Sequence, residues 1–274
     1  MRRASIGGIN DHWGVTVVTV HNFSYGMINP GLGYIVSCLG AFLGLRCVIR
    51  SRAYDGSGRA PWLVLGAVSL GATGIWAMHF IAMLGFTIPG QQILYNVPVT
   101  IISMLLAILV VGVGLFIVGY SRGGWLPLIV GGVIVGLGVA GMHYLGMAAM
   151  SMQDSVRYNM PLVVLSVVIA IVAGTAALWA GTAVRSIKAT IGASLIMGVA
   201  VSGMHYTGMA AMKVYAGSMG TMISGSLAFS FVIPLVLGLS MLTLVLAVVL
   251  VLAPDEDEIR TDAALRGRVG AQSR

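Results

Sequence analysis

The sequence predicts an all-α integral membrane protein: seven transmembrane helices, built from about three helical-hairpin repeats, with the N-terminus outside and the C-terminus in the cytoplasm. Three observations lead to this prediction: the composition, a series of long uncharged runs, and a ten-residue segment that recurs along the chain. Of the 274 residues, 58% are hydrophobic and only 8% are charged, whereas charged residues make up about 25% of a typical soluble domain. The mean hydropathy of +0.98 and the abundance of aliphatic side chains exclude both an ordinary soluble domain and a disordered chain.

Each predicted span is an apolar run long enough to cross the hydrocarbon core of a bilayer, which takes about 20 residues. The spans lie at about 27–48, 61–86, 98–120, 125–150, 161–184, 189–212 and 227–252. They form a membrane domain over 27–252, between an extracytoplasmic segment at 1–26 and a short cytoplasmic tail at 253–274. Pro98 and Pro161 open two spans, where a helix does not need the missing N–H, whereas Pro234 is expected to kink the last span.

The lysines and arginines set the orientation, because positive residues concentrate on the cytoplasmic side of a membrane. One side of the predicted bundle holds four of them: Arg2, Arg3, Arg157 and Lys213. The other side holds eleven and is therefore predicted to be cytoplasmic: Arg46, Arg50, Arg52, Arg59, Arg122, Arg185, Lys188, Arg260, Arg266, Arg268 and Arg274. The net charge of +7 lies in short gaps between apolar runs and forms no basic stripe, so we expect a lipid bilayer and not nucleic acid as the partner.

The recurring segment contains a histidine. Residues 141–150 reappear as 203–212 with nine of ten positions identical, and a weaker copy lies at 76–83. A second marker, Tyr-Asn-x-Pro, occurs at 95–98 and again at 158–161. The repeating unit is therefore a helical hairpin of about 62–64 residues, used about three times.

Three of the five histidines, His79, His143 and His205, occupy equivalent positions in the repeats. All three lie on spans that run outward, at a depth that corresponds to the outer leaflet. His21 precedes the first span on the same side. His12 lies further towards the N-terminus, in a segment whose position cannot be derived from the predicted spans. An ionisable residue inside a membrane span is by default a candidate functional residue, so the threefold recurrence predicts one shared site.

Methionines accompany each histidine at two spacings. Residues four apart share one face of a helix, which places Met83, Met147 and Met209 beside His79, His143 and His205, with Met150 and Met212 extending the same stripe outward. The methionine directly before each histidine is rotated by about 100°; this second set is Met78, Met142 and Met204. Both sets are candidate ligands, and the geometry favours the first.

Imidazole and thioether together form a soft ligand set that suits copper, above all Cu(I), while imidazole alone also serves zinc and iron. No Asp or Glu lies inside a predicted span, so magnesium and calcium would lack ligands and a proton-coupled carrier would lack its usual carboxylates. The chain contains no phosphate-binding loop and no CxxC pair. The chemistry therefore points to a soft-metal site.

The Met-His-Tyr-Thr string at 204–207, with its variants at 142–145 and 78–81, resembles the motif of the MHYT family of bacterial integral membrane sensors. The resemblance covers about residues 21–252 and implies a multi-pass protein of the bacterial plasma (inner) membrane. It further implies that the motif histidines and the methionines before them bind copper, through which such proteins are proposed to sense a diatomic gas: O2, CO or NO. Phe80 and Leu145 depart from the Tyr and Thr of the motif.

The leading hypothesis is a membrane sensor that binds a metal through outer-leaflet His and Met residues, with His21 as a further candidate ligand, and detects a diatomic gas or a redox state. The alternatives are a copper-handling membrane protein (a chaperone or carrier), a membrane metallo-oxidoreductase, and a structural scaffold; an enzyme is less favoured than a sensor. Members of the family often carry a cytoplasmic output domain for cyclic dinucleotide turnover. Because only a short tail follows the last span here, we expect the signal to leave through a cytoplasmic signalling partner or through helix movement.

Overall fold

The computed structural model describes residues 9–10, 16–216 and 224–252, and this part contains seven helices long and apolar enough to span a membrane. Six of the seven spans are continuous helices. They are α1 (Ile28–Ser51), α4 (Val97–Tyr120), α5 (Trp125–Ala148), α6 (Met160–Ala183), α7 (Ile187–Ala211) and α8 (Val232–Leu252). The second span is composite and follows the short turn η1 (Gly56–Gly58); it consists of α2 (Arg59–Val68), η2 (Ser69–Ala77) and α3 (Met78–Met83). Each predicted span therefore corresponds to one helix or helical run.

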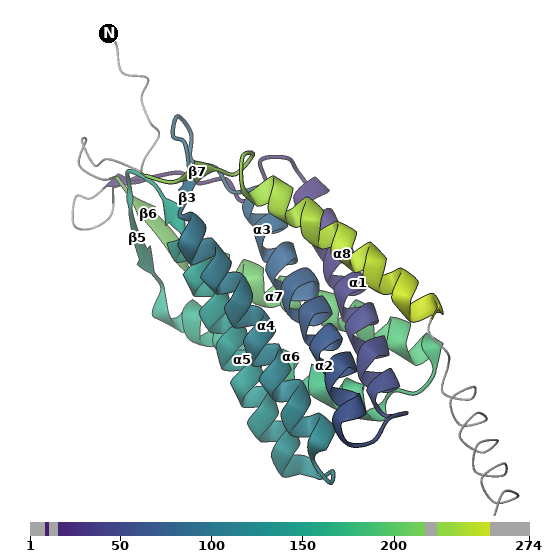
Figure 1. The fold of residues 1–274 in the computed structure, drawn as a ribbon. Coiled ribbons are helices and arrows are strands. Elements are labelled where there is room, and N and C mark those ends of the chain that lie inside the picture. The colour runs from purple at the N-terminus through teal and green to yellow at the C-terminus, as the bar shows by residue number, and fades with distance from the viewer. Residues whose placement is uncertain (1–8, 11–15, 217–223, 253–274) are drawn as a thin grey trace, which may run out of the picture.

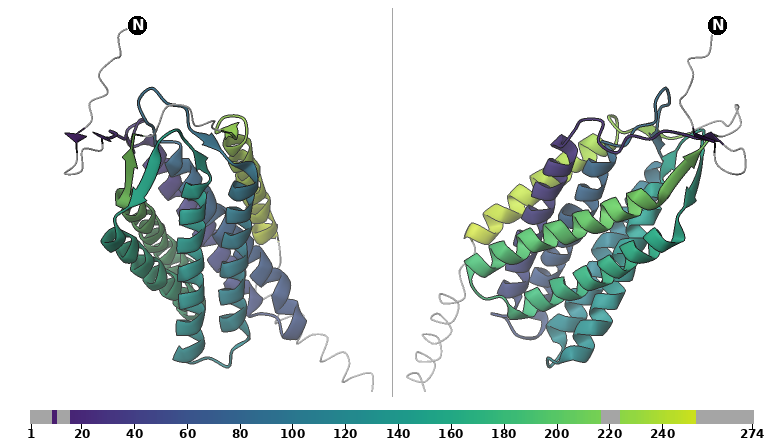
Figure 2. Two further views of the ribbon diagram at one scale, coloured as in Figure 1. Left: turned by 90° about the vertical axis from the view of Figure 1, so that its left-hand side faces the viewer. Right: turned by 180° about the vertical axis from the view of Figure 1, so that it is seen from behind.

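Six of the spans form a closed ring, and the seventh packs outside it (Figures 1 and 2). The contacts run from α1 to the second span, then to α4, α5, α6 and α7, and from α7 back to α1. Helix α8 contacts α1, η2 and α3 on the outside of this ring. The second span, α5 and α7, which carry the repeated motif, therefore alternate around the ring with α1, α4 and α6.

The three repeats are visible as hairpins that are tied to one another in the same way. The side chains of Asn96 and Asn159 accept hydrogen bonds from backbone N–H groups in the first turns of α4 and α6, as N-caps do. The backbone N–H of Asn96 donates to the carbonyl of Ala149 just after α5, and that of Asn159 donates to the carbonyl of Ala211 at the end of α7, each at 2.8 Å. The loop of one repeat is thus anchored to the motif-bearing helix of the next.

Two small sheets, which the sequence analysis did not anticipate, cover the end of the bundle near the motifs (Figure 1). The strand order of the first is β1-β2-β6-β5, and that of the second is β4-β3-β7. Their strands are β1 (Ile9–Asn10), β2 (Thr16–Val17), β3 (Leu94–Tyr95), β4 (Met150–Ser151), β5 (Ser155–Tyr158), β6 (Met212–Tyr215) and β7 (Ser226–Leu227). Strands of two to four residues are too short to produce a recognisable alternation of apolar and polar residues.

Two sequence-based expectations about helix geometry are wrong. Helices α5 and α7 end at Ala148 and Ala211, so Met150 and Met212 lie in β4 and β6 and do not extend a helical methionine stripe. Pro234 does not kink the seventh span, because α8 begins only at Val232, and a proline in the first turn removes no intrahelical hydrogen bond. The bend expected from Pro234 is replaced by a helix start.

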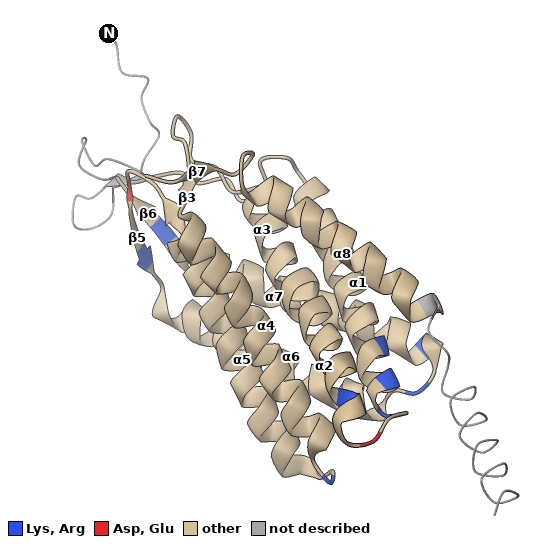
Figure 3. Ribbon diagram, in the orientation of Figure 1, with Lys and Arg blue, Asp and Glu red and all other residues tan. Residues whose placement is uncertain are grey.

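The charged residues lie at the two ends of the bundle (Figure 3). Arg157 and Lys213 face each other in the β5–β6 pair, at the end that carries the sheets. The opposite end carries Arg46, Arg50, Arg52, Arg59, Arg122, Arg185 and Lys188. Arg2, Arg3 and the basic residues after 252 lie outside the described residues. This separation agrees with the predicted orientation, in which the sheets lie outside and the arginine-rich end lies in the cytoplasm.

The orientation makes a labelling prediction. In a background that carries Cys38→Ala and Cys47→Ala, Ser57→Cys lies between α1 and α2 at the arginine-rich end, and Gln92→Cys lies in the loop that leads to β3. Both positions are exposed. In intact cells an impermeant maleimide should label Gln92→Cys and spare Ser57→Cys until the membrane is opened. Labelling of Ser57→Cys in intact cells would reverse the orientation.

Candidate metal centre

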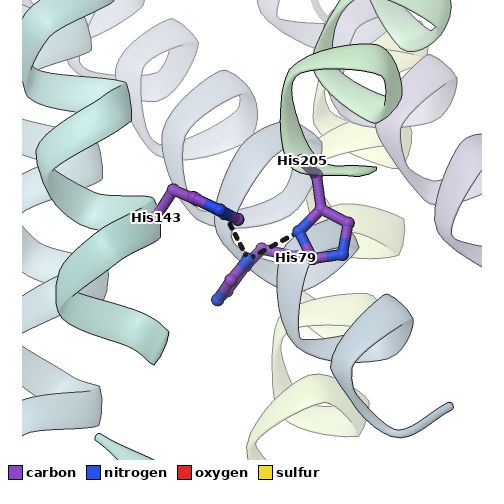
Figure 4. Close-up of side chains that lie close together, drawn as sticks. All are labelled: His79, His143 and His205. Carbon is purple, nitrogen blue, oxygen red and sulfur yellow. Dashed lines mark hydrogen bonds between the residues drawn. The ribbon is translucent and has the colours of Figure 1, made fainter. Parts of the chain in front are cut away.

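The three motif histidines meet inside the ring of helices (Figure 4). His79 of α3, His143 of α5 and His205 of α7 are 1%, 0% and 1% exposed. The Nδ1 atom of His79 lies 2.9 Å from Nδ1 of His205 and 3.1 Å from Nδ1 of His143. Among the histidines, cysteines and acidic residues in the described part of the chain, these three bring ligand atoms within 4.8 Å of one another. The shared histidine site predicted from the repeats is therefore present as a cluster.

The convergence of three Nδ1 atoms is compatible both with hydrogen bonds between the rings and with a metal ion that they share. A neutral imidazole has one N–H and one lone pair, so hydrogen bonds within the cluster need at least one ring with its proton on Nδ1 and leave Nε2 atoms to be satisfied elsewhere. The Nε2 atoms of His79 and His143 are buried and have no hydrogen-bond partner among the described residues. Nitrogen ligands about 2.0–2.1 Å from a tetrahedral metal lie about 3.3 Å apart, within a few tenths of an ångström of the distances observed here.

Two glycines make room for the histidine rings, and the sequence analysis missed this role. Nε2 of His79 lies against Gly146 of α5, where a Cβ atom would come within 2.5 Å of it, and Nε2 of His143 lies in the same way against Gly208 of α7. Each glycine stands three residues after the histidine of its own copy, so the ring from one repeat is seated on the helix of the next. The equivalent position in the first copy is Ala82. The sequence pattern that could have indicated this role is His-x-x-Gly, which occurs in two of the three copies.

The residue after each histidine is aromatic and packs against a second aromatic ring nearer the sheets. The pairs are Phe80 with Tyr95, Tyr144 with Tyr158, and Tyr206 with Phe23, at centroid distances of 6.0, 5.6 and 5.4 Å. Burial raises the pKa of Tyr95, and burial together with the neighbouring Tyr144 raises the pKa of Tyr158. Both phenols therefore stay neutral at physiological pH and add no charge above the histidines. Phe80, which departs from the motif, keeps the ring contact and lacks only the hydroxyl.

The remaining candidate ligands fall into two groups. All six motif methionines are buried: Met83, Met147, Met209, Met78, Met142 and Met204. The side chain of Met78 packs toward α1 at Gly33, and both methionine sets stay predictions as ligands. His21 is exposed and is not part of the histidine cluster; its backbone pairs with Thr87 beyond the end of α3. His12 lies outside the described residues.

Fold and site together define a multi-pass membrane protein with a repeated helical hairpin and a buried histidine triad. The chain belongs to the MHYT family, described as the bacterial signalling protein N-terminal repeat, whose sequence profile matches residues 73–131 and 136–194. The matched ranges contain His79 and His143, and His205 lies beyond them. No solved structure matches the chain.

Proteins similar to this chain are bacterial signalling proteins. The bifunctional diguanylate cyclase/cyclic di-GMP phosphodiesterase MucR of Pseudomonas aeruginosa is 36% identical over 200 residues, which cover 71% of this chain and 29% of MucR. The cyclic di-GMP phosphodiesterase NbdA of the same organism is 36% identical over 70% of this chain and 25% of NbdA. An uncharacterized signaling protein of Caulobacter vibrioides is 37% identical over 65% of this chain and 22% of that protein. The chain thus spans about a quarter of the length of these relatives.

The contact between Gly208 and His143 predicts that two glycines of α7, Gly208 and Gly203, respond differently to substitution by alanine. Gly208→Ala forces a methyl group into the buried ring of His143 and should lower the free energy of unfolding by about 1–3 kcal/mol. Gly203→Ala lies on the same helix with no atom near the added methyl group and should leave stability unchanged or raise it, because alanine favours the helix. Thermal unfolding in detergent measures both variants. Equal effects of the two substitutions would show that Gly208 does not seat the ring.

Proposed function

We propose that this MHYT domain is a membrane sensor that binds copper at the triad of His79, His143 and His205 and responds to a diatomic gas or to a redox state. The observation that carries the proposal is the convergence of three buried Nδ1 atoms from three equivalent positions of the repeat. Three nitrogen atoms that approach one another at a buried point form a ready set of ligands for one metal ion, because each neutral imidazole can direct its single lone pair to that point.

The surroundings of the triad support copper over the alternatives. Within the described spans no carboxylate is present, so a hard cation would find no oxygen ligand of the kind it prefers. The free cysteines, Cys38 and Cys47, lie on α1 and are not part of the cluster. Six buried methionines accompany the three imidazoles, and thioethers select Cu(I). A bound copper ion would supply a redox couple and a coordination position that three imidazoles leave open.

The helices that hold the triad also supply a path for the signal. His79, His143 and His205 lie four, five and six residues before the outer ends of α3, α5 and α7, and these spans continue through the bundle to the arginine-rich end. A change in the spacing of the three imidazoles therefore moves three alternate members of the ring relative to the other three. A cytoplasmic partner or output domain would read this movement. The names of MucR and NbdA suggest cyclic di-GMP turnover as the output.

The first test is metal content, measured by inductively coupled plasma mass spectrometry after copper reconstitution of the purified chain. We expect about one copper ion for each chain and its loss when His79→Ala, His143→Ala and His205→Ala are combined, because all three Nδ1 ligands are then absent. His21→Ala is the matched control and should retain copper, since His21 lies apart from the cluster. Equal metal in the triple variant and in the unaltered chain would rule out the triad as the site.

The second test is gas binding. Reduced, copper-loaded protein should give a new infrared band when CO is added, and the triple histidine variant should give none. If loaded protein binds copper at the triad and gives no spectral response to CO, NO or O2, the metal site stands and the gas-sensing role fails.

A further inference from the structure

An apolar cavity of about 50 Å³ lies inside the ring of six helices. Its lining comes from α1, η2, α4, α5, α6 and α7, the six helical segments that form the ring. Apart from the hydroxyl of Ser37, every lining side chain is aliphatic, a methionine or absent, as in glycine. The cavity therefore belongs to the bundle as a whole and not to a single helix pair.

The cavity lies within one helical turn of the histidine triad, and Met204, directly before His205, also lines it. Ile75, Val139 and Val201 all line it, and each stands four residues before a triad histidine, at His79, His143 and His205. Residues four apart lie on the same face of a helix, with Cβ atoms about 5–6 Å apart. The three histidines and the three aliphatic side chains are thus successive layers on the same inner face of the ring, with the cavity on the cytoplasmic side of the imidazoles.

The lining determines what the cavity accepts. A buried water molecule needs two to four polar partners, and apolar cavities stay dry and take up apolar guests such as xenon. A single hydroxyl does not meet that need, and an anion such as azide or cyanide would lose its hydration without compensation. The cavity thus selects for a small, uncharged, weakly polar molecule.

We propose that this cavity is a binding site for a small apolar gas molecule, which it holds one helical turn from the imidazoles of the triad. The identity of the gas as the sensed ligand rests on the proposed function; the existence of the apolar binding site does not. Because Ile75, Val139, Val201 and Met204 line the cavity next to the triad, a bound molecule reaches the imidazoles by passing between these side chains. The proposal adds selection by polarity to the site: neutral diatomic molecules enter, and charged metal ligands are excluded.

Xenon is the probe, because it binds apolar cavities and does not coordinate metals. Xenon binding to the metal-free chain of 274 residues in nanodiscs is measured by xenon-129 NMR. The combination of Val139→Ile and Val201→Ile adds two methyl groups to the lining and should weaken xenon binding by about tenfold or more. The matched control is Val130→Ile with Val199→Ile, on the same helices at exposed positions, which should bind xenon as the unaltered chain does. If the double variant does not fold, Ala177→Val replaces it as the variant with a filled cavity, because Ala177 lines the cavity from α6.

The possible outcomes separate this proposal from the proposed function. Xenon binding that is lost in the filled variants and kept in the control supports the cavity site. Absence of xenon binding in the unaltered chain overturns it, and so does equal binding in the filled and control variants. Xenon binding that persists when His79, His143 and His205 are replaced by alanine, in protein that fails the copper test, would keep the cavity site while the copper proposal alone fails.

Discussion

The structure depends on the meeting of three imidazole rings at a point that water does not reach. Polar groups inside the hydrocarbon region of a membrane must find their partners within the protein, and the Nδ1 atoms of His79, His143 and His205 find one another. This requirement fixes the depth at which the three motif-bearing helices pack. If a histidine stood one residue further along its helix, its imidazole would move by about 1.5 Å along the helix axis and rotate by about 100° around it. The internal repeat satisfies it by presenting the same residue at the same depth three times.

The three motif-bearing spans alternate around the ring with α1, α4 and α6. Gly146 and Gly208 allow the helices to pack closely, because each lies against the histidine ring of the preceding repeat. The backbone hydrogen bonds of Asn96 and Asn159 connect each loop to the next motif-bearing helix. Each repeat is therefore completed by its neighbour, so the site belongs to the assembly of repeats and to none of them singly.

The same arrangement separates two chemical environments along one axis. The triad supplies three imidazole nitrogen donors near the end of the bundle that carries the sheets, and Ile75, Val139 and Val201 lead from it to an apolar cavity. One repeat unit produces both layers, because residues four apart share a helix face. The triad and the cavity thus lie on the same three helices, and the geometry of both depends on how these helices pack.

The sequence by itself determined the seven spans, the hairpin repeat and the identity of the triad, because these follow from hydropathy and recurrence, which are local properties of the chain. It also predicted the orientation, from the distribution of charge. The tertiary structure decided which faces meet. It excluded His21 from the cluster, placed Met150 and Met212 in strands, and put Gly146 and Gly208 against the rings of His79 and His143. Spacing along the chain shows which residues share a helix face, but contact between faces depends on the order and rotation of the helices in the bundle. That order is set by packing over the whole ring, and no single segment of the sequence contains it.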